Sequence, residues 1–420
     1  MEKARKIDFR RALEALRNGV PNRDAVGALG SSQSEAESAF SRRLSSVESS
    51  AGRGEQVSGL LIAGGFGAGK SHLLDYFEHL ALSRNFVCSR VAIGKETPLF
   101  DPGKLFAAAL DGAAVPGVSG EAIREMASRL QPGSRSYGEF SGWVSGAASG
   151  LSDLFAATLS LYERLSNDPE AAGRIADFWS GDPLPVAWIR QGLKQIGRSG
   201  TYALKPVKPK DLALQRFQFA ARLILEAGYS GWILLADEVE LVGRYSVLQR
   251  GKSYAELARW MGRVQGQACP GLMAVAAITD DFGLAVLQGK GDLDAIGAKL
   301  RAKETDEYAA IAGRAETGMH LIEREALTLQ APGEAALKHT YRRLKEIHGK
   351  AYGWDPPELP VSVTSTTRRM RSYVRRWVHE WDLKRLYPGA ELCIEEEQNV
   401  APGYEQDAAL EGNSETGEGE

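Results

Sequence analysis

Cysteine is scarce in this chain, and long apolar runs are missing from it. The three cysteines, Cys88, Cys269 and Cys393, lie far apart in 420 residues and do not form the paired spacing of a metal site. Cys88 and Cys269 stand in apolar surroundings, where we expect them to pack in the core of a protein from a reducing compartment. No apolar run reaches the roughly 18 residues that a membrane span needs, and none follows the charged start as a secretion signal would. We therefore expect a cytoplasmic protein that does not contact a membrane.

Basic residues are missing from residues 391–420, which carry ten acidic residues. The rest of the chain has seven more basic than acidic residues, so the charge is unevenly distributed. The acidic stretch is poor in aromatic residues and rich in glycine and glutamate, a composition typical of a disordered tail. Such a tail either keeps the protein soluble or mimics nucleic-acid charge and screens the basic body. The composition leaves both interpretations open.

The most informative stretch is rich in glycine and fits G-x-x-x-x-G-K-[ST]. It follows the apolar run Leu60–Ala63 and precedes residues 73–80, whose apolar positions have helical spacing. Strand, glycine loop and helix are the context that a phosphate-binding loop requires, and this context makes an accidental glycine turn a weaker interpretation. The residues that we expect to contact a nucleotide are Gly64, Gly65, Phe66, Gly67, Ala68, Gly69, Lys70, Ser71 and His72.

The residue types in this loop suit the binding of a triphosphate. Glycines let the backbone turn tightly and direct several N–H groups to one point, where the helix N-terminus adds positive potential. We expect Lys70 to reach the β- and γ-phosphates and the Ser71 hydroxyl to bind Mg²⁺. His72 is expected to pack against or cap the helix beside the nucleotide, since catalysis does not require it.

A second candidate element is an apolar strand, residues 231–236, that ends in Asp237 and Glu238. We expect Asp237 to hold Mg²⁺, directly or through water, and Glu238 to activate the attacking water. An acidic cap at a strand end is the structural alternative. Thr279, after the apolar run 272–278, is a candidate for contact with the water or the γ-phosphate.

Arginine is needed in such a site because the transferred phosphoryl group spreads negative charge over its oxygens. Arg324 precedes the last expected strand and is a candidate to act across a subunit interface, with Arg301 as a rival. A solvated surface charge is the alternative interpretation of each. Arg368, Arg369 and Arg371 lie on a basic helix, residues 366–377, from which one of them is a candidate nucleotide sensor. The others would suit nucleic-acid phosphates, and a charged outer face on a packed helix explains them equally well.

The order of elements predicts an α/β fold with a parallel sheet. Strands are expected at residues 60–63, 86–93, 231–236, 272–278 and 326–329, with helices between them. We expect an N-terminal helical segment at 1–56, an ATPase core at 57–331 with a helical insertion at about 112–206, a C-terminal helical lid at 332–390, and the acidic tail. The aromatic residues of the insertion fit core packing better than base stacking. They are Phe140, Trp143, Phe155, Tyr162, Phe178, Trp179 and Trp188.

These features together resemble the P-loop ATPases of the AAA+ class. Beyond that, the chain is similar to the BrxD-type ATP-binding proteins of bacterial BREX phage-defence systems, up to about Pro388. The stretches that carry this resemblance are Gly64–Leu74, Lys95–Leu99, Phe178–Asp182, Asp237–Leu241, Ser253–Met261, Ala277–Phe282 and Tyr373–Trp377. The resemblance implies a protein that acts beside a helicase, a methyltransferase and other defence proteins in discriminating foreign DNA.

Residues and resemblance lead to one functional hypothesis and two alternatives. The hypothesis is a Mg²⁺-dependent ATPase that works as a conformational or mechanical switch, with DNA and a second copy of the chain as candidate partners. One alternative is a scaffold that binds ATP and does not hydrolyse it, and Glu238 argues against it. The other is a DNA-binding module that its ATPase only loads.

Overall fold

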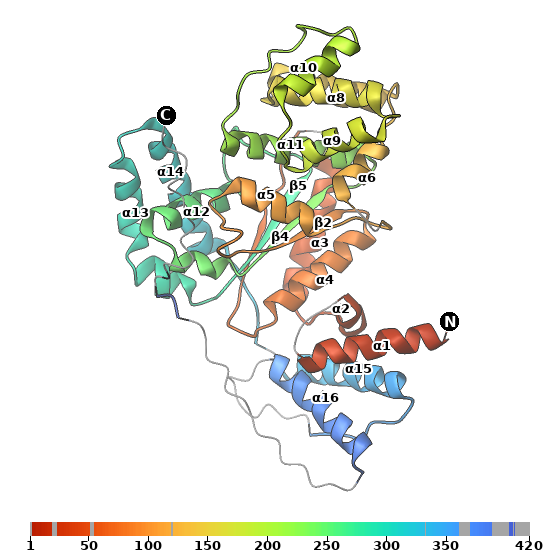
Figure 1. Ribbon diagram of the computed structural model, residues 1–420. Coiled ribbons are helices and arrows are strands. Elements are labelled where there is room, and N and C mark those ends of the chain that lie inside the picture. Colours follow the sequence, from red (N-terminus) through yellow and green to blue (C-terminus); the bar gives the residue numbers. More distant parts are fainter. Residues whose placement is uncertain are drawn as a thin grey trace.

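The computed structural model describes residues 2–18, 23–50, 54–118, 121–331, 333–360, 370–388, 403–405 and 407. A mostly parallel sheet lies at the centre, with strands in the order β3-β2-β4-β5-β1-β6 (Figure 1). The pairs β2–β4, β4–β5, β5–β1 and β1–β6 are parallel, and β2–β3 is antiparallel. The strands are β1 (Leu60–Ala63), β2 (Val87–Ala92), β3 (Ala113–Ala114), β4 (Trp232–Asp237), β5 (Leu272–Ile278) and β6 (Leu327–Thr328). The predicted α/β class and parallel sheet are confirmed.

Strands β1, β4 and β5 are buried along their whole length because helices cover both faces of the sheet. Successive side chains of a strand point to opposite faces of the sheet, so alternate strand residues pack in two different hydrophobic cores. On one face they pack against α3 (Ser34–Ser50) and α4 (Lys70–Ser83). On the other face they pack against α5 (Pro102–Asp111) and α11 (Pro209–Glu226).

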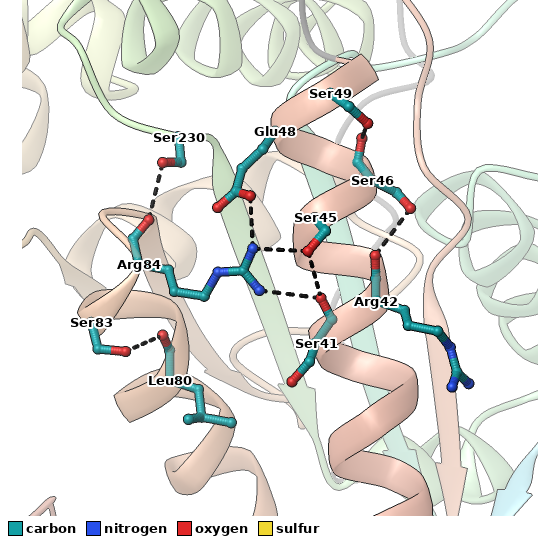
Figure 2. Close-up of polar contacts among 10 residues, drawn as sticks. All are labelled: Ser41, Arg42, Ser45, Ser46, Glu48, Ser49, Leu80, Ser83, Arg84 and Ser230. Carbon is teal, nitrogen blue, oxygen red and sulfur yellow. Dashed lines mark hydrogen bonds and ion pairs between the residues drawn. The ribbon is translucent and has the colours of Figure 1, made fainter.

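Helix α3 is held to the sheet layer by Arg84, which follows α4. The Arg84 guanidinium donates to the Ser41 carbonyl, the Ser45 hydroxyl and the Glu48 carboxylate at 3.2, 3.0 and 2.7 Å (Figure 2). The Arg84 carbonyl accepts from the Ser230 hydroxyl at 3.0 Å, just before β4. These contacts join α3 to the sheet.

The helical insertion consists of five α-helices in the described residues between β3 and α11. They are α6 (Ala122–Ser128), α7 (Arg135–Ser145), α8 (Asp153–Leu165), α9 (Pro169–Ser180) and α10 (Val186–Gln195). Their aromatic side chains pack inward, as expected, and the rings of Phe155 and Trp179 lie 5.1 and 5.0 Å from Phe219 of α11. The insertion therefore shares one core with the sheet.

The first two helices pack with the last two. Helices α1 (Glu2–Asn18) and α2 (Arg23–Leu29) form one hydrophobic core with α15 (Glu334–Tyr352) and α16 (Met370–Leu386), below the sheet in Figure 1. Tyr341 contacts the rings of Trp377 and Trp381 in this core. Arg17 forms an ion pair with Asp382 at 2.7 Å across it. We call these four helices the helical body. The expected N-terminal segment, residues 1–56, is thus divided between the helical body and the sheet.

Three helices pack beside the sheet, and a buried ion pair joins the first two of them. They are α12 (Val247–Trp260), α13 (Asp292–Arg301) and α14 (Asp306–His320). Arg250 of α12 donates two hydrogen bonds to Asp292 of α13 at 2.8 and 2.5 Å, and the Tyr254 hydroxyl donates a third at 2.8 Å. None of the helices in the described part of the chain has the length and apolar composition that crossing a bilayer would demand.

Replacing Asp292 with alanine should lower the free energy of unfolding by about 3–5 kcal/mol, because the Arg250 charge would stay buried without its partner. Denaturant titration at neutral pH measures this change. The matched control is Asp294→Ala, an exposed carboxylate in the same helical turn, which should shift stability by less than about 0.5 kcal/mol. Equal effects of the two substitutions would contradict the prediction.

Candidate functional site

The carboxyl ends of β1, β5 and β4 lie side by side, and each is followed by residues singled out in the sequence. The glycine loop follows β1, Thr279 follows β5, and Glu238 follows Asp237 at the end of β4. The loop is joined to the neighbouring strand, since the Gly64 amide donates to the Ile278 carbonyl at 3.1 Å. Ligands of open parallel sheets bind at this edge.

Two glycines of the loop have a backbone that other residues rarely adopt. Gly67 has φ 79° and Gly69, the N-cap of α4, has φ 98°, both in the left-handed region. These turns bring the chain into the first turn of α4, whose free N–H groups create positive potential. The local conformation is therefore suited to an anion.

The Lys70 side chain folds back onto the start of the glycine loop. Its Nζ atom donates to the Gly64 carbonyl at 2.8 Å and lies 3.8 Å from Oε1 of Glu240. The side chain is 8% exposed, so this charge is largely shielded from water. A buried ammonium group with only partial pairing attracts further negative charge.

The carboxylate at the end of β4, Asp237, is paired with an arginine. Oδ2 of Asp237 accepts from Arg90 at 2.8 Å, and Oδ1 accepts from the Glu238 amide at 3.0 Å. Arg90 also pairs with Asp75 of α4. Together these contacts hold Asp237 in a fixed orientation next to the loop.

Glu238 has an unusual backbone for a residue with a side chain. Its φ of 59° lies in the left-handed region, which costs about 1–3 kcal/mol and persists only when surrounding structure enforces it. Partial desolvation and then the nearby Asp237 charge raise the pKa of the Glu238 carboxyl, and Lys70 and Arg90 oppose this rise. The carboxyl is exposed and lines the cavity described below.

Sequence analysis missed Glu240 as a site residue. Glu240 lies in the short helix η3 (Val239–Arg244), which directs the Glu240 carboxyl back toward Lys70. The Glu240 side chain is buried there. Its Oε2 atom has no hydrogen-bond partner among the described residues, and burial raises the pKa of the group. The acidic pattern after β4 was visible in the sequence, but the turn that returns the second glutamate to the site was not.

Thr279 lies at the same sheet edge but is not among the residues that line the cavity. Its hydroxyl contacts the Tyr404 hydroxyl, which donates to Oδ1 of Asp281 at 2.8 Å. Tyr404 belongs to the acidic stretch for which we expected disorder. In the structure, charged and aromatic groups of the core contact the segment Gly403–Glu405. The disorder expected for residues 391–420 stays a prediction. Most of the other tail residues lie outside the described residues.

A cavity of about 300 Å³ lies between the glycine loop and the helical body. Residues Phe66–Leu73 and the acidic residues Asp237, Glu238 and Glu240 line one side. The opposite side combines α1, α2, α15 and α16 with the segment Gly30–Gln33 and has both apolar and polar side chains. Its side chains include Ala15, Leu16, Leu29, His339, Thr340, Met370, Arg371 and Val374. The acidic residues and Lys70 thus gather on the side of the glycine loop, and the cavity's apolar side chains come from the helical body.

His72 connects the two sides of the cavity. Its ring donates through Nε2 to the Gly30 carbonyl at 2.8 Å, and burial lowers the pKa of the ring. Gln33 and Gln330 exchange two hydrogen bonds at 3.0 and 3.1 Å close by. His72 therefore packs as expected and fixes the segment that follows α2.

The candidate arginines are placed differently from one another. Arg371 lines the cavity from α16. Arg324 and Arg301 are exposed, lie beside Glu323 and Glu316, and are not among the described residues that line it. Arg368 and Arg369 lie outside the described residues. Within one chain, the structure brings only Arg371 of these candidates to the cavity in the part that it describes.

The donor set at the loop fits Mg²⁺. Ser71 and Asp237 both line the cavity and offer hard oxygen ligands. The described residues contain no group of three His, Cys, Asp or Glu side chains that could hold a metal alone. Two protein oxygens with the remaining positions left to phosphate and water is the arrangement that Mg²⁺ prefers at nucleotide sites.

Comparison with known proteins gives one family. The model of the BREX system ATP-binding proteins BrxC/D matches residues 5–111 and 208–380, about two thirds of the chain. These segments contain the glycine loop, five of the six strands and the residues that line the cavity; β3 and helices α6–α10 lie between them. The model does not distinguish BrxC from BrxD. No curated protein and no solved structure matches.

Proposed function

Because the chain belongs to the family of BREX system ATP-binding proteins BrxC/D, we propose that it hydrolyses ATP with Mg²⁺ in the cavity beside Lys70 and uses the cycle as a switch. The proposal includes the P-loop NTPase class of the core and the roles of the individual residues. One observation carries it: a buried lysine and a glycine loop form the charged side of a cavity to which the helical body contributes apolar side chains.

The charged side of the cavity suits the triphosphate. The Lys70 ammonium is partly paired with Gly64 and Glu240, contacts that phosphate oxygens at the same place would replace. Amides of Gly67–Ser71 at the start of α4 complete the phosphate cradle. The apolar side chains Leu16, Leu29, Met370 and Val374 suit the base and ribose.

The carboxylates suit the chemistry of hydrolysis. Ser71 and Asp237 would hold Mg²⁺, which supplies neutralisation of phosphate charge when it is bound. Glu238 accepts a proton from a water molecule as that oxygen bonds to the γ-phosphorus and the bond to the ADP oxygen breaks. The raised pKa of Glu238 brings the carboxylate closer to the basicity that this proton transfer requires.

The switch follows from what surrounds the cavity. Its walls come from the sheet and from the helical body, so a bound nucleotide contacts both and its hydrolysis changes the link between them. Arg371 is the candidate sensor on α16. Arg324, which is exposed, is free to act on the site of a second copy in a homo-oligomer. Family membership supports partners from the same defence system. That they include a helicase and a methyltransferase, and that the protein works with DNA, is part of the proposal.

Removing Mg²⁺ should lower ATP turnover by at least about a hundredfold, because the metal contributes several kcal/mol of charge stabilisation. The experiment measures phosphate release by the full chain with MgCl₂, with excess EDTA, and after Mg²⁺ is restored. Repeating it with duplex DNA and with neighbouring BREX proteins identifies what stimulates the cycle. ATP binding without turnover under all conditions would favour a scaffold, and no ATP binding by the folded protein would overturn the proposal.

A further inference from the structure

A short segment of the acidic tail docks beside the proposed catalytic residues. The Tyr404 hydroxyl contacts Oγ1 of Thr279 and donates to Oδ1 of Asp281 at 2.8 Å. The Tyr404 ring packs edge-on against Phe282, with ring centres 5.9 Å apart. All three core residues lie directly after β5, at the sheet edge that carries the glycine loop.

Backbone contacts hold the same segment from the other side. The guanidinium of Arg244, in η3, donates to the Gly403 carbonyl at 3.0 Å, and the Arg244 carbonyl accepts from the Asp407 amide at 3.2 Å. The Lys290 ammonium donates to the carbonyls of Tyr404 and Gly243. The segment is thus attached both to η3, which carries Glu240, and to the residues after β5.

The hydrogen bonds around Tyr404 determine where each proton lies. A tyrosine hydroxyl has one proton, and the Tyr404 proton is donated to the Asp281 carboxylate. Thr279 must therefore donate its single proton to the Tyr404 oxygen. Phosphate oxygens at neutral pH are acceptors, so Thr279 cannot donate to a γ-phosphate while Tyr404 is docked.

We propose that the tail segment Gly403–Glu405 is an autoinhibitory latch, in which Tyr404 occupies the Thr279 hydroxyl and restrains ATP turnover. The inference rests on the proposed function, because Thr279 matters only if a γ-phosphate is bound nearby. Since Tyr404 and the γ-phosphate compete for one proton, each weakens the binding of the other by the same factor. ATP, but not ADP, then releases the tail.

The first test is Tyr404→Phe, which keeps the ring on Phe282 and removes only the hydroxyl. Steady-state ATP turnover should rise by about two- to tenfold, the worth of one hydrogen bond. The effect should vanish in a Thr279→Val background, where no threonine proton remains to be released. The matched control, Tyr387→Phe, removes an exposed hydroxyl and should leave turnover unchanged. Unchanged or lower turnover in Tyr404→Phe would overturn the latch.

The second test does not depend on hydrolysis. Hydrogen–deuterium exchange of the peptide 403–407 in the wild-type chain is compared between Mg²⁺ with ADP and Mg²⁺ with a non-hydrolysable ATP analogue. Faster exchange with the analogue supports the latch, and equal exchange with both nucleotides bound contradicts it. Nucleotide binding is measured separately on the same sample. Absence of binding would mean that the proposed function has failed, and the latch would fall with it.

Discussion

Replacing Lys70 with alanine should weaken ATP binding by at least about a hundredfold and abolish turnover. Hydrogen bonds to charged groups contribute about 1.5–3 kcal/mol each, and we expect Lys70 to make such bonds with two phosphates. No other lysine lines the cavity in the part of the chain that the structure describes, so we expect no substitute. Calorimetric titration with Mg²⁺ and ATP measures the affinity, and phosphate release measures turnover.

The control for this substitution is Lys299→Ala, which removes an exposed lysine from α13. It should leave both quantities unchanged. Thermal unfolding of each variant without nucleotide checks the fold, because Lys70→Ala also removes the partner of the buried Glu240. If folded Lys70→Ala bound ATP as tightly as the wild type, the nucleotide would have to lie outside this cavity.

Replacing Glu238 with glutamine should lower turnover by about 10²–10⁴-fold and leave ATP affinity within about threefold of the wild type. Glutamine has the same shape but cannot accept the proton of the attacking water. The raised pKa of Glu238 also predicts a pH dependence: turnover should increase as pH rises through that pKa and the carboxyl loses its proton. Rate measurements across pH on the wild type and the variant test both statements.

An exposed glutamate provides the comparison. Glu325→Gln, in the short helix before β6, should have wild-type turnover. Unchanged turnover in Glu238→Gln would remove this residue from the mechanism, and the buried Glu240 would then be the carboxylate to test. A wild-type chain that binds ATP without turning it over would instead support a scaffold.

The sheet and the position of the glycine loop before α4 were predictable because their signals are local. Strands such as Leu272–Ile278 are apolar without interruption, which is typical of a strand covered on both faces. The glycine loop has a fixed spacing, and its Lys70 stands where that spacing places it. Asp237 follows directly from the end of β4.

The rest depended on contacts between residues far apart in the sequence. Nothing near Leu16 indicates that it lines a cavity together with Val374, because an amphipathic helix shows which face is buried but not its partner. Tyr404 stands in a segment whose composition predicts disorder, and its docking depends on Lys290 and Phe282 more than a hundred residues earlier. The candidate arginines could be identified in the sequence, but the sequence does not indicate how far each lies from the site.

The helical body has a consequence for the biosynthesis of this protein. Because α1 and α2 pack with α15 and α16, residues from both ends of the matched region form one wall of the cavity. A growing chain on the ribosome holds the glycine loop early but lacks that wall until α16 has emerged. More than three hundred residues are therefore synthesised between α1 and the helices α15 and α16 that cover its apolar face. During that time the apolar face is uncovered by them and is a target for chaperones.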